Sequence, residues 1–145
     1  MRKKLNQIDA SNDILIVENF SDWHLKYFKL AKKQSEKSTH YQHKLGCVIV
    51  KNNRVLGLGF NKLKSHPKSP HAYSFIHAEF DSVRKIDPED IKGATVFVYR
   101  EHKNGNFALA KPCKYCAKLL RDVQVKSVYF TIDSGIGCYH FKQVL

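Results

Sequence analysis

The sequence has no long apolar run and no apparent leader segment, and each absence argues against a class of protein. No stretch of the 145 residues approaches the ~18 consecutive apolar residues that a membrane-spanning helix requires. The basic first residues, 1–5, are not followed by an apolar segment with a small-residue cleavage site, which argues against a secretory signal. We therefore expect a cytoplasmic protein with no membrane partner.

Cysteines are also few, and four of them do not make a disulfide scaffold. Cys113 and Cys116 form a Cys-x-x-Cys pair, which in a reducing compartment indicates metal or redox chemistry more often than a structural bridge. Cys47 and Cys138 lie in apolar stretches and are expected to be small buried side chains. The cysteine usage therefore makes residues 113–116 the first candidate site.

Acidic residues are scarce, and the scarcity is local. The chain has 25 Lys and Arg against 13 Asp and Glu, a net charge of +12, and residues 37–76 and 102–121 contain no carboxylate at all. The basic residues of these two segments are Lys37, Lys44, Lys51, Arg54, Lys62, Lys64, Lys68, Lys103, Lys111, Lys114, Lys118 and Arg121. Such one-sign stretches favour a polyanion or a phosphate-bearing ligand, although a solvated basic surface has the same composition.

The hydrophobic pattern predicts one α/β domain over residues 21–145, preceded by a tail or loose strand over residues 1–20. The predicted helices span about 22–37, 77–86 and 112–122, and the predicted strands span 45–50, 55–60, 95–99, 128–132 and 138–141. Only residues 133–137 separate the last two strands, which is too short for a parallel crossover. The last strand is therefore expected to return antiparallel, in a mixed sheet covered by helices.

Two short motifs, His77-Ala78-Glu79 and Pro112-Cys113-Lys114-Tyr115-Cys116, each open a predicted helix. One histidine and two cysteines supply three zinc ligands, and a catalytic zinc keeps its fourth position open for water. A helix N-terminus lowers the pKa of a thiol, and a carboxylate two residues from a ligand is well placed to move protons. His-x-Glu alone arises often by chance, and a lone Cys-x-x-Cys is also found as a redox motif or as half of a structural zinc site. Together they predict a zinc centre of His77, Cys113 and Cys116, with Glu79 as the acid–base group.

These motifs resemble the His-x-Glu and Pro-Cys-x-x-Cys signature of zinc deaminases, and the chain is similar to the cytidine deaminase-like superfamily over nearly all residues after 20. The resemblance implies a three-layer α/β/α fold with a mixed five-stranded sheet and Zn²⁺ as cofactor. It implies that the Ala78 backbone amide contacts the base and that Asn61 contacts the sugar or base. Lys44, in the first basic segment, is a further candidate substrate contact.

The implied reaction is hydrolytic deamination of cytosine to uracil, with Glu79 protonating N3 and then the departing amine. The acid-free segments favour single-stranded DNA or RNA as substrate by a narrow margin. Aromatic residues that interleave with the basic segments are candidate stacking surfaces: Tyr41, Phe60, Tyr73, Phe75 and Tyr115. The alternative is that they are core aromatics, which is favoured for Phe60 and Phe75. The alternative substrate is a free pyrimidine nucleotide, deoxycytidylate or cytidine. An adenine-directed nucleic-acid deaminase and a non-catalytic zinc module that binds nucleic acid are further alternatives.

The branch of the superfamily is not decided by the sequence. The short turn at 133–137 is similar to free cytidine deaminases, blasticidin deaminases and bacterial toxins, whereas residues 43–46 and 61–67 are similar to phage deoxycytidylate-type deaminases. His66 and His71 raise a second zinc site as an alternative, but no cysteine lies near them, which favours loop residues near the substrate mouth. His40 and His43 are similar and are expected at the surface or facing a phosphate. Relatives are often dimers or tetramers, so a homo-oligomer is a further alternative.

Overall fold

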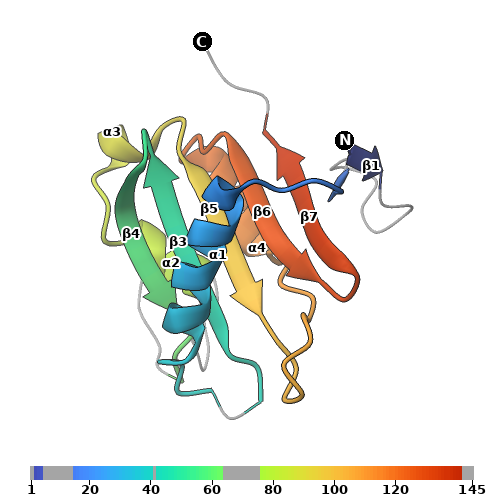
Figure 1. The fold of residues 1–145 in the computed structure, drawn as a ribbon. Helices are drawn as coiled ribbons and strands as arrows, with labels where there is room; N and C mark the ends of the chain where they lie inside the picture. Colours follow the sequence, from blue (N-terminus) through green and yellow to red (C-terminus); the bar gives the residue numbers. More distant parts are fainter. Residues whose placement is uncertain (1, 5–14, 41, 64–75, 142–145) are drawn as a thin grey trace.

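A computed structural model of the chain describes residues 2–4, 15–40, 42–63 and 76–141. Within these ranges one mixed sheet has the strand order β1-β2-β7-β6-β5-β3-β4 (Figure 1). The strands are β1 (Arg2–Lys4), β2 (Leu15–Val17), β3 (Leu45–Lys51), β4 (Arg54–Phe60), β5 (Thr95–Arg100), β6 (Ser127–Ile132) and β7 (Gly135–His140). The helices are α1 (Asp22–Ser35), α2 (Ala78–Val83), α3 (Pro88–Ile91) and α4 (Lys114–Asp122).

The pairing of the strands confirms the predicted mixed α/β sheet. The β3–β4 hairpin turns at Asn52 and Asn53, whose φ angles of 53° and 60° are the left-handed values that a tight hairpin needs. Strand β5 runs parallel to β6, and β7 returns antiparallel to β6 as predicted, with Ser127 opposite His140.

The prediction of five strands was wrong, because the described residues form seven. The additional strands β1 and β2 have three residues each: β2 lies where a loose strand was expected within residues 1–20, whereas β1 is too short for a periodic hydrophobic signal. Strand β2 pairs antiparallel with β7, placing Leu15 opposite Cys138. The antiparallel return of β7 would otherwise leave its outer edge open, and covering that edge satisfies backbone groups that would otherwise be unpaired.

Helices cover both faces of the sheet, with α1 on one face and α2 and α4 on the other (Figure 1). On the α1 side, Tyr27 and Ala31 belong to a buried cluster with Val48 and Phe97 from the sheet. The opposite face has its own buried cluster, which includes Leu120 of α4. Burial of apolar area on both faces stabilises the sheet without any contribution from a metal.

Two glycines let helices approach the sheet closely at the end where the site lies. A Cβ at Gly46 would lie 1.9 Å from the Ala31 carbonyl oxygen of α1. A Cβ at Gly59 of β4 would lie 2.6 Å from the Ala78 carbonyl oxygen of α2. No side chain fits at either distance, so these glycines set how closely α1 and α2 pack. The first turn of α2 is thereby held against the end of β4.

Some sequence predictions fall outside the described residues. They concern the second zinc site and three of the aromatic residues: His66, His71, Tyr41, Tyr73 and Phe75. The division into a segment 1–20 and a domain 21–145 stays a prediction. Among the described residues, no helix combines the length and apolar character needed to cross a membrane.

Candidate metal centre

The first turns of α2 and α4 bring the two sequence motifs together. His77 is the N-cap residue of α2 and Cys113 is the N-cap residue of α4, both with extended backbone angles. The Nδ1 atom of His77 lies 3.5 Å from Sγ of Cys116 and 3.8 Å from Sγ of Cys113. The three potential ligand atoms all lie within 4.8 Å of one another. Residues 36 positions apart in the sequence thus form one cluster.

The cluster has the chemistry and the spacing of a zinc site. Thiolate and imidazole are preferred zinc ligands, and three of them with an open fourth position are typical of catalytic sites. Tetrahedral zinc with Zn–S of about 2.3 Å and Zn–N of about 2.1 Å places sulfur and nitrogen about 3.6 Å apart. The distances of 3.5 and 3.8 Å from His77 to the two cysteines agree with that value. The three residues therefore fit a zinc ion.

Charge in the cluster is distributed between one sulfur and the imidazole. A hydrogen bond from the Cys116 thiol is the main cause that lowers the pKa of Cys113, and the same contact raises the pKa of Cys116. Burial lowers the pKa of His77, but the hydrogen bond to Cys113 and the charge of Glu79 outweigh burial and raise it. An anionic Cys113 facing the imidazole is a ligand set prepared for a cation.

Glu79 lies in the first turn of α2, two residues after His77, and only 2% of its surface is exposed. Burial disfavours the charged carboxylate and raises the pKa of Glu79 to about 7. A carboxyl group with a pKa near the working pH can both accept and return a proton. The burial and the pKa of Glu79 therefore suit the acid–base role predicted from the sequence.

A pocket of about 180 Å³ opens beside these residues, and we call it the metal pocket. It is lined by His40, His43, Leu45, Asn61, His77, Ala78, Glu79, Lys111 and Cys113. Five residues predicted from the sequence therefore share one pocket. Cys116 is fully buried behind them. His40 and His43, expected at the surface or facing a phosphate, both line this pocket. Lys111 was not among the predicted site residues, although it is adjacent to the Pro112-Cys113 motif.

Asn61 lines the metal pocket, but its side chain already holds the backbone of the neighbouring segment. Its Oδ1 accepts a hydrogen bond from the Leu45 backbone N–H at 2.9 Å, and its Nδ2 donates to the His43 carbonyl oxygen. The amide thus fixes residues 43–45 at the start of β3. Its predicted contact with sugar or base stays a prediction, and the structure adds this positioning role.

Lys44, in contrast, does not line the metal pocket. The structure places this exposed side chain in a neighbouring cavity, together with Arg100 and Lys103. The two cavities meet at His43, which lines both. The sequence therefore located Lys44 near the site, and the structure separates it from the residues that surround the metal cluster.

The matches to known proteins agree with this geometry. The family model of the cytidine and deoxycytidylate deaminase zinc-binding region matches residues 21–132. The chain belongs to this family. Its members are hydrolytic deaminases with zinc as cofactor, which accounts for the cluster of His77, Cys113 and Cys116.

Individual relatives of this deaminase include two deoxycytidylate deaminases and one tRNA deaminase subunit. Deoxycytidylate deaminase of Mycobacterium phage D29 is 26% identical over 134 residues, covering 78% of this chain and 97% of the relative. The tRNA-specific adenosine deaminase subunit tad2 of Schizosaccharomyces pombe is 26% identical over 128 residues, covering 88% of this chain and 29% of the relative. The apo crystal structure of dCMP deaminase from cyanophage S-TIM5 has a TM-score of 0.59 and 26% identity, covering 77% of this chain and 84% of that chain.

A buried carboxylate that the sequence analysis did not single out supports the metal centre of the deaminase. Asp81 of α2 is fully buried and accepts hydrogen bonds from the Phe60 backbone N–H at 3.1 Å and from Lys62 Nζ at 2.9 Å. Arg84 and Lys85 also donate to it, at 2.8 and 3.3 Å. Burial raises the pKa of Asp81, but these hydrogen bonds outweigh burial and lower it. Asp81 thereby ties the helix that carries Glu79 to the end of β4.

Proposed function

We propose that the protein deaminates a free pyrimidine nucleotide of the deoxycytidylate type, converting its cytosine base to uracil and releasing ammonia. The observation that carries the proposal is that His77, Cys113 and the buried Glu79 line one small pocket. The sequence alone favoured single-stranded nucleic acid by a narrow margin. Similarity to the phage deoxycytidylate deaminases supports the free-nucleotide alternative better.

In this proposal His77, Cys113 and Cys116 hold the zinc ion. When bound, zinc supplies a Lewis acid that makes water acidic enough to serve as a nucleophile near neutral pH. The N-cap positions of His77 and Cys113 fix two ligands at the ends of helices that pack on the same face of the sheet. The ligands are therefore held by the fold before the metal arrives.

Glu79 moves the protons of the reaction. Water adds to C4 of the cytosine ring, the C4–N bond to the amino group breaks, and ammonia leaves while a carbonyl forms at C4. Glu79 takes one proton from the attacking water and delivers it to N3, then takes the second proton from the hydroxyl group at C4 and delivers it to the departing amine. The buried position of Glu79 and its pKa of about 7 support this cycle near neutral pH. The Ala78 backbone amide, at the same helix end, is proposed to contact the base carbonyl.

The size of the metal pocket also supports a small substrate group. Pockets that enclose whole drug-sized ligands have volumes of about 300 Å³ or more. The metal pocket, at about 180 Å³, is smaller and suits a single base. The remainder of a nucleotide would then lie outside the metal pocket.

The test compares four substrates with the zinc-loaded full chain. Deoxycytidylate, deoxycytidine, a cytosine-containing single-stranded oligonucleotide and the matching adenine-containing oligonucleotide are incubated in parallel, and deaminated products are quantified. We expect deoxycytidylate to have the highest kcat/KM. A higher kcat/KM for the cytosine oligonucleotide would return the assignment to single-stranded nucleic acid. Turnover of the adenine oligonucleotide alone would overturn the cytosine assignment.

A further inference from the structure

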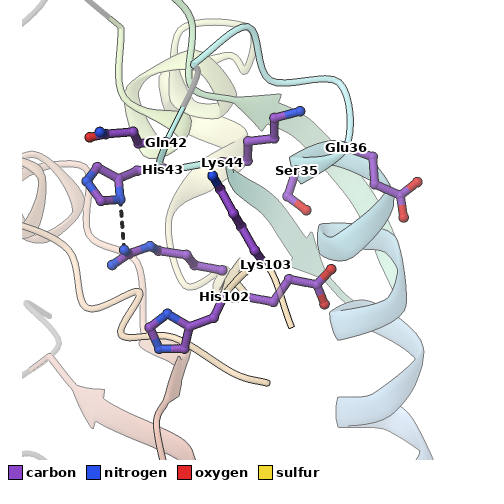
Figure 2. A pocket seen from close by; sticks show the side chains of 9 residues that line it. Ser35, Glu36, Gln42, His43, Lys44, His102 and Lys103 are labelled. Atoms are coloured by element: carbon purple, nitrogen blue, oxygen red, sulfur yellow. Dashed lines mark hydrogen bonds between the residues drawn. The ribbon is translucent and has the colours of Figure 1, made fainter. Parts of the chain in front are cut away.

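Beside the metal pocket lies a second cavity of about 550 Å³, which we call the basic cavity (Figure 2). It is lined by Ser35, Glu36, Gln42, His43, Lys44, Arg100, Glu101, His102 and Lys103. We propose that the basic cavity binds the phosphate group of the nucleotide whose base occupies the metal pocket. This inference rests on the proposed function, because it assigns the phosphate to the substrate.

The two cavities adjoin because of the sheet register. Leu45, the first residue of β3, pairs with Arg100, the last residue of β5. The segment that precedes β3 therefore passes beside Arg100, and its His43 lines both cavities. A ligand that is too large for the metal pocket can continue past His43 into the basic cavity.

The charges in the basic cavity are segregated. Lys44, Arg100 and Lys103 contribute three basic side chains. Of the two carboxylates, Glu101 accepts a hydrogen bond from the Tyr99 hydroxyl at 2.6 Å and lies 3.8 Å from Lys32 Nζ. Figure 2 shows the Glu36 carboxylate pointing away from His43. The end of the cavity nearest to the metal pocket is therefore cationic, which favours an anion there.

The Arg100 side chain is held in place before any ligand binds. Its Nη1 donates to the Leu109 carbonyl oxygen at 3.1 Å, and its Nη2 contacts His43 Nδ1 at 2.8 Å. A guanidinium group has five donors in a planar fork that matches phosphate oxygens, and these two contacts with described residues use two of them. A fixed guanidinium loses little conformational entropy on binding, so it is suited to recognise a phosphate.

His43 is a neutral donor at the junction of the two cavities. Arg100 has only donors, so Nδ1 of His43 must accept in their contact, and the neutral imidazole then carries its proton on Nε2. Burial, the charge of Arg100 and the neighbouring His40 all lower the pKa of His43, which keeps the ring neutral. His43 can thus donate to a phosphate or sugar oxygen without adding charge repulsion to Arg100.

Lys103 is presented by an ordered turn between β5 and the zinc motif. The His102 backbone N–H donates to the Asn106 carbonyl oxygen at 2.7 Å, and Gly105 N–H donates to the His102 carbonyl oxygen at 2.9 Å. Gly105 has a φ of 88°, which a glycine adopts without strain. Figure 2 shows the Lys103 side chain extending toward the segment that carries His43 and Lys44. Lys103 and Arg100 therefore face the same space from one connection.

The test is a calorimetric titration of the zinc-loaded full chain with deoxycytidylate, deoxycytidine and inorganic phosphate. Two variants are titrated. Lys103→Glu reverses the charge of the side chain, whereas Arg100→Lys keeps the charge but removes the planar guanidinium fork. We expect each variant to weaken deoxycytidylate binding by about tenfold or more, because charge-assisted hydrogen bonds contribute that much. Deoxycytidine binding should stay within about twofold of the wild type, because no phosphate is present.

The matched control is Lys92→Glu, the same charge reversal at an exposed lysine that precedes β5 at the end opposite to Arg100. It should leave all three affinities unchanged. Equal weakening of deoxycytidylate and deoxycytidine by Lys103→Glu would overturn the proposal. Unchanged deoxycytidylate binding in both cavity variants, or a wild type that binds neither deoxycytidylate nor inorganic phosphate, would also overturn it.

Because binding is measured without turnover, the two proposals fail separately. One outcome is that the wild type forms no product from deoxycytidylate but binds inorganic phosphate, and that Lys103→Glu removes this binding. That outcome would contradict the proposed function and support phosphate binding by the basic cavity.

Inorganic phosphate should also act as a competitive inhibitor of deoxycytidylate turnover. Non-competitive inhibition would assign the phosphate to a separate effector. If Lys103→Glu or Arg100→Lys loses oligonucleotide binding but retains deoxycytidylate binding, the phosphate bound by the basic cavity belongs to a polynucleotide backbone. Either result would overturn the substrate assignment.

Discussion

The metal pocket and the basic cavity share His43, but they are built in opposite ways. The metal pocket places its reactive residues at the first turns of two helices, where Glu79 is 2% and Cys116 0% exposed while His77 and Cys113 are half-buried. The basic cavity is lined by strand ends, turns and the C-terminal end of α1, and Lys44 and Lys103 are exposed. Chemistry that depends on desolvation is thus placed on rigid elements. In our proposal, selectivity for the rest of the ligand depends on the surface side chains of the basic cavity.

Metal removal is expected to have the largest effect, and it acts on the metal pocket alone. Treatment with a chelator should lower deamination by at least about 10⁴-fold, because the Lewis acid and the nucleophile are lost together. Circular dichroism should show a folded protein, since apolar clusters on both faces of the sheet persist without metal. Added zinc should restore activity.

The opposite result would change the class of the protein. Unfolding on metal removal would support the alternative of a zinc-stabilised module without catalysis. Phosphate binding by the basic cavity provides an internal control, since its residues are separate from the zinc ligands and its affinity should change by less than about twofold.

Asp81→Asn is expected to have the second largest effect, because it weakens the support of the metal pocket. The substitution leaves Lys62, Arg84 and Lys85 around a neutral side chain and should lower the free energy of unfolding by about 2–4 kcal/mol. Urea denaturation at neutral pH measures the change. The control is Asp122→Asn, which breaks the exposed pair with Lys118 and should change the free energy by less than about 1 kcal/mol.

The same residue predicts a pH dependence. The pKa of Asp81 is lower in the folded protein than in the unfolded chain, so its stabilising contribution is present above the unfolded value of about 3.9. The contribution is lost as the pH falls below that value toward the folded pKa. The free energy of unfolding of the wild type should therefore fall more steeply below about pH 4 than that of Asp81→Asn. Parallel pH profiles of the two proteins would refute this role of Asp81.

Asn61→Ala should lower the stability less than Asp81→Asn does. It tests the segment 43–45, which lies between the two cavities. The substitution removes the hydrogen bonds to the Leu45 N–H and the His43 carbonyl oxygen, and should lower the free energy of unfolding by about 1–3 kcal/mol. Because His43 and Leu45 line the metal pocket, kcat/KM for deoxycytidine and deoxycytidylate should fall together. A loss of activity at unchanged stability would instead indicate that Asn61 acts only as a substrate contact.

The zinc ligands could be predicted from the sequence because helix starts are local features. Cys113, the N-cap residue of α4, and Cys116 in its first turn are three positions apart, so their separation in space follows from helix geometry. His77 could be added because its motif opens a second helix. The antiparallel return of β7 was likewise predictable, since the turn before it is short.

The basic cavity could not be predicted, because its residues meet only through the sheet. Arg100 and His43 are 57 positions apart, and their contact depends on the register that pairs Leu45 with Arg100. A one-residue shift of that register would turn the neighbouring side chains to the other face. Asp81 was missed for a similar reason: its partners Phe60 and Lys62 are provided by β4 and the residues that follow it.

The most direct test of the proposed mechanism is the turnover of deoxycytidylate by Glu79→Gln. Glutamine preserves the size of the side chain but cannot transfer a proton. The variant should bind as much zinc as the wild type and should bind deoxycytidylate, while kcat falls by about 10²–10⁴-fold. Wild-type turnover by a zinc-loaded Glu79→Gln protein would contradict the assignment of Glu79 as the proton-transferring group.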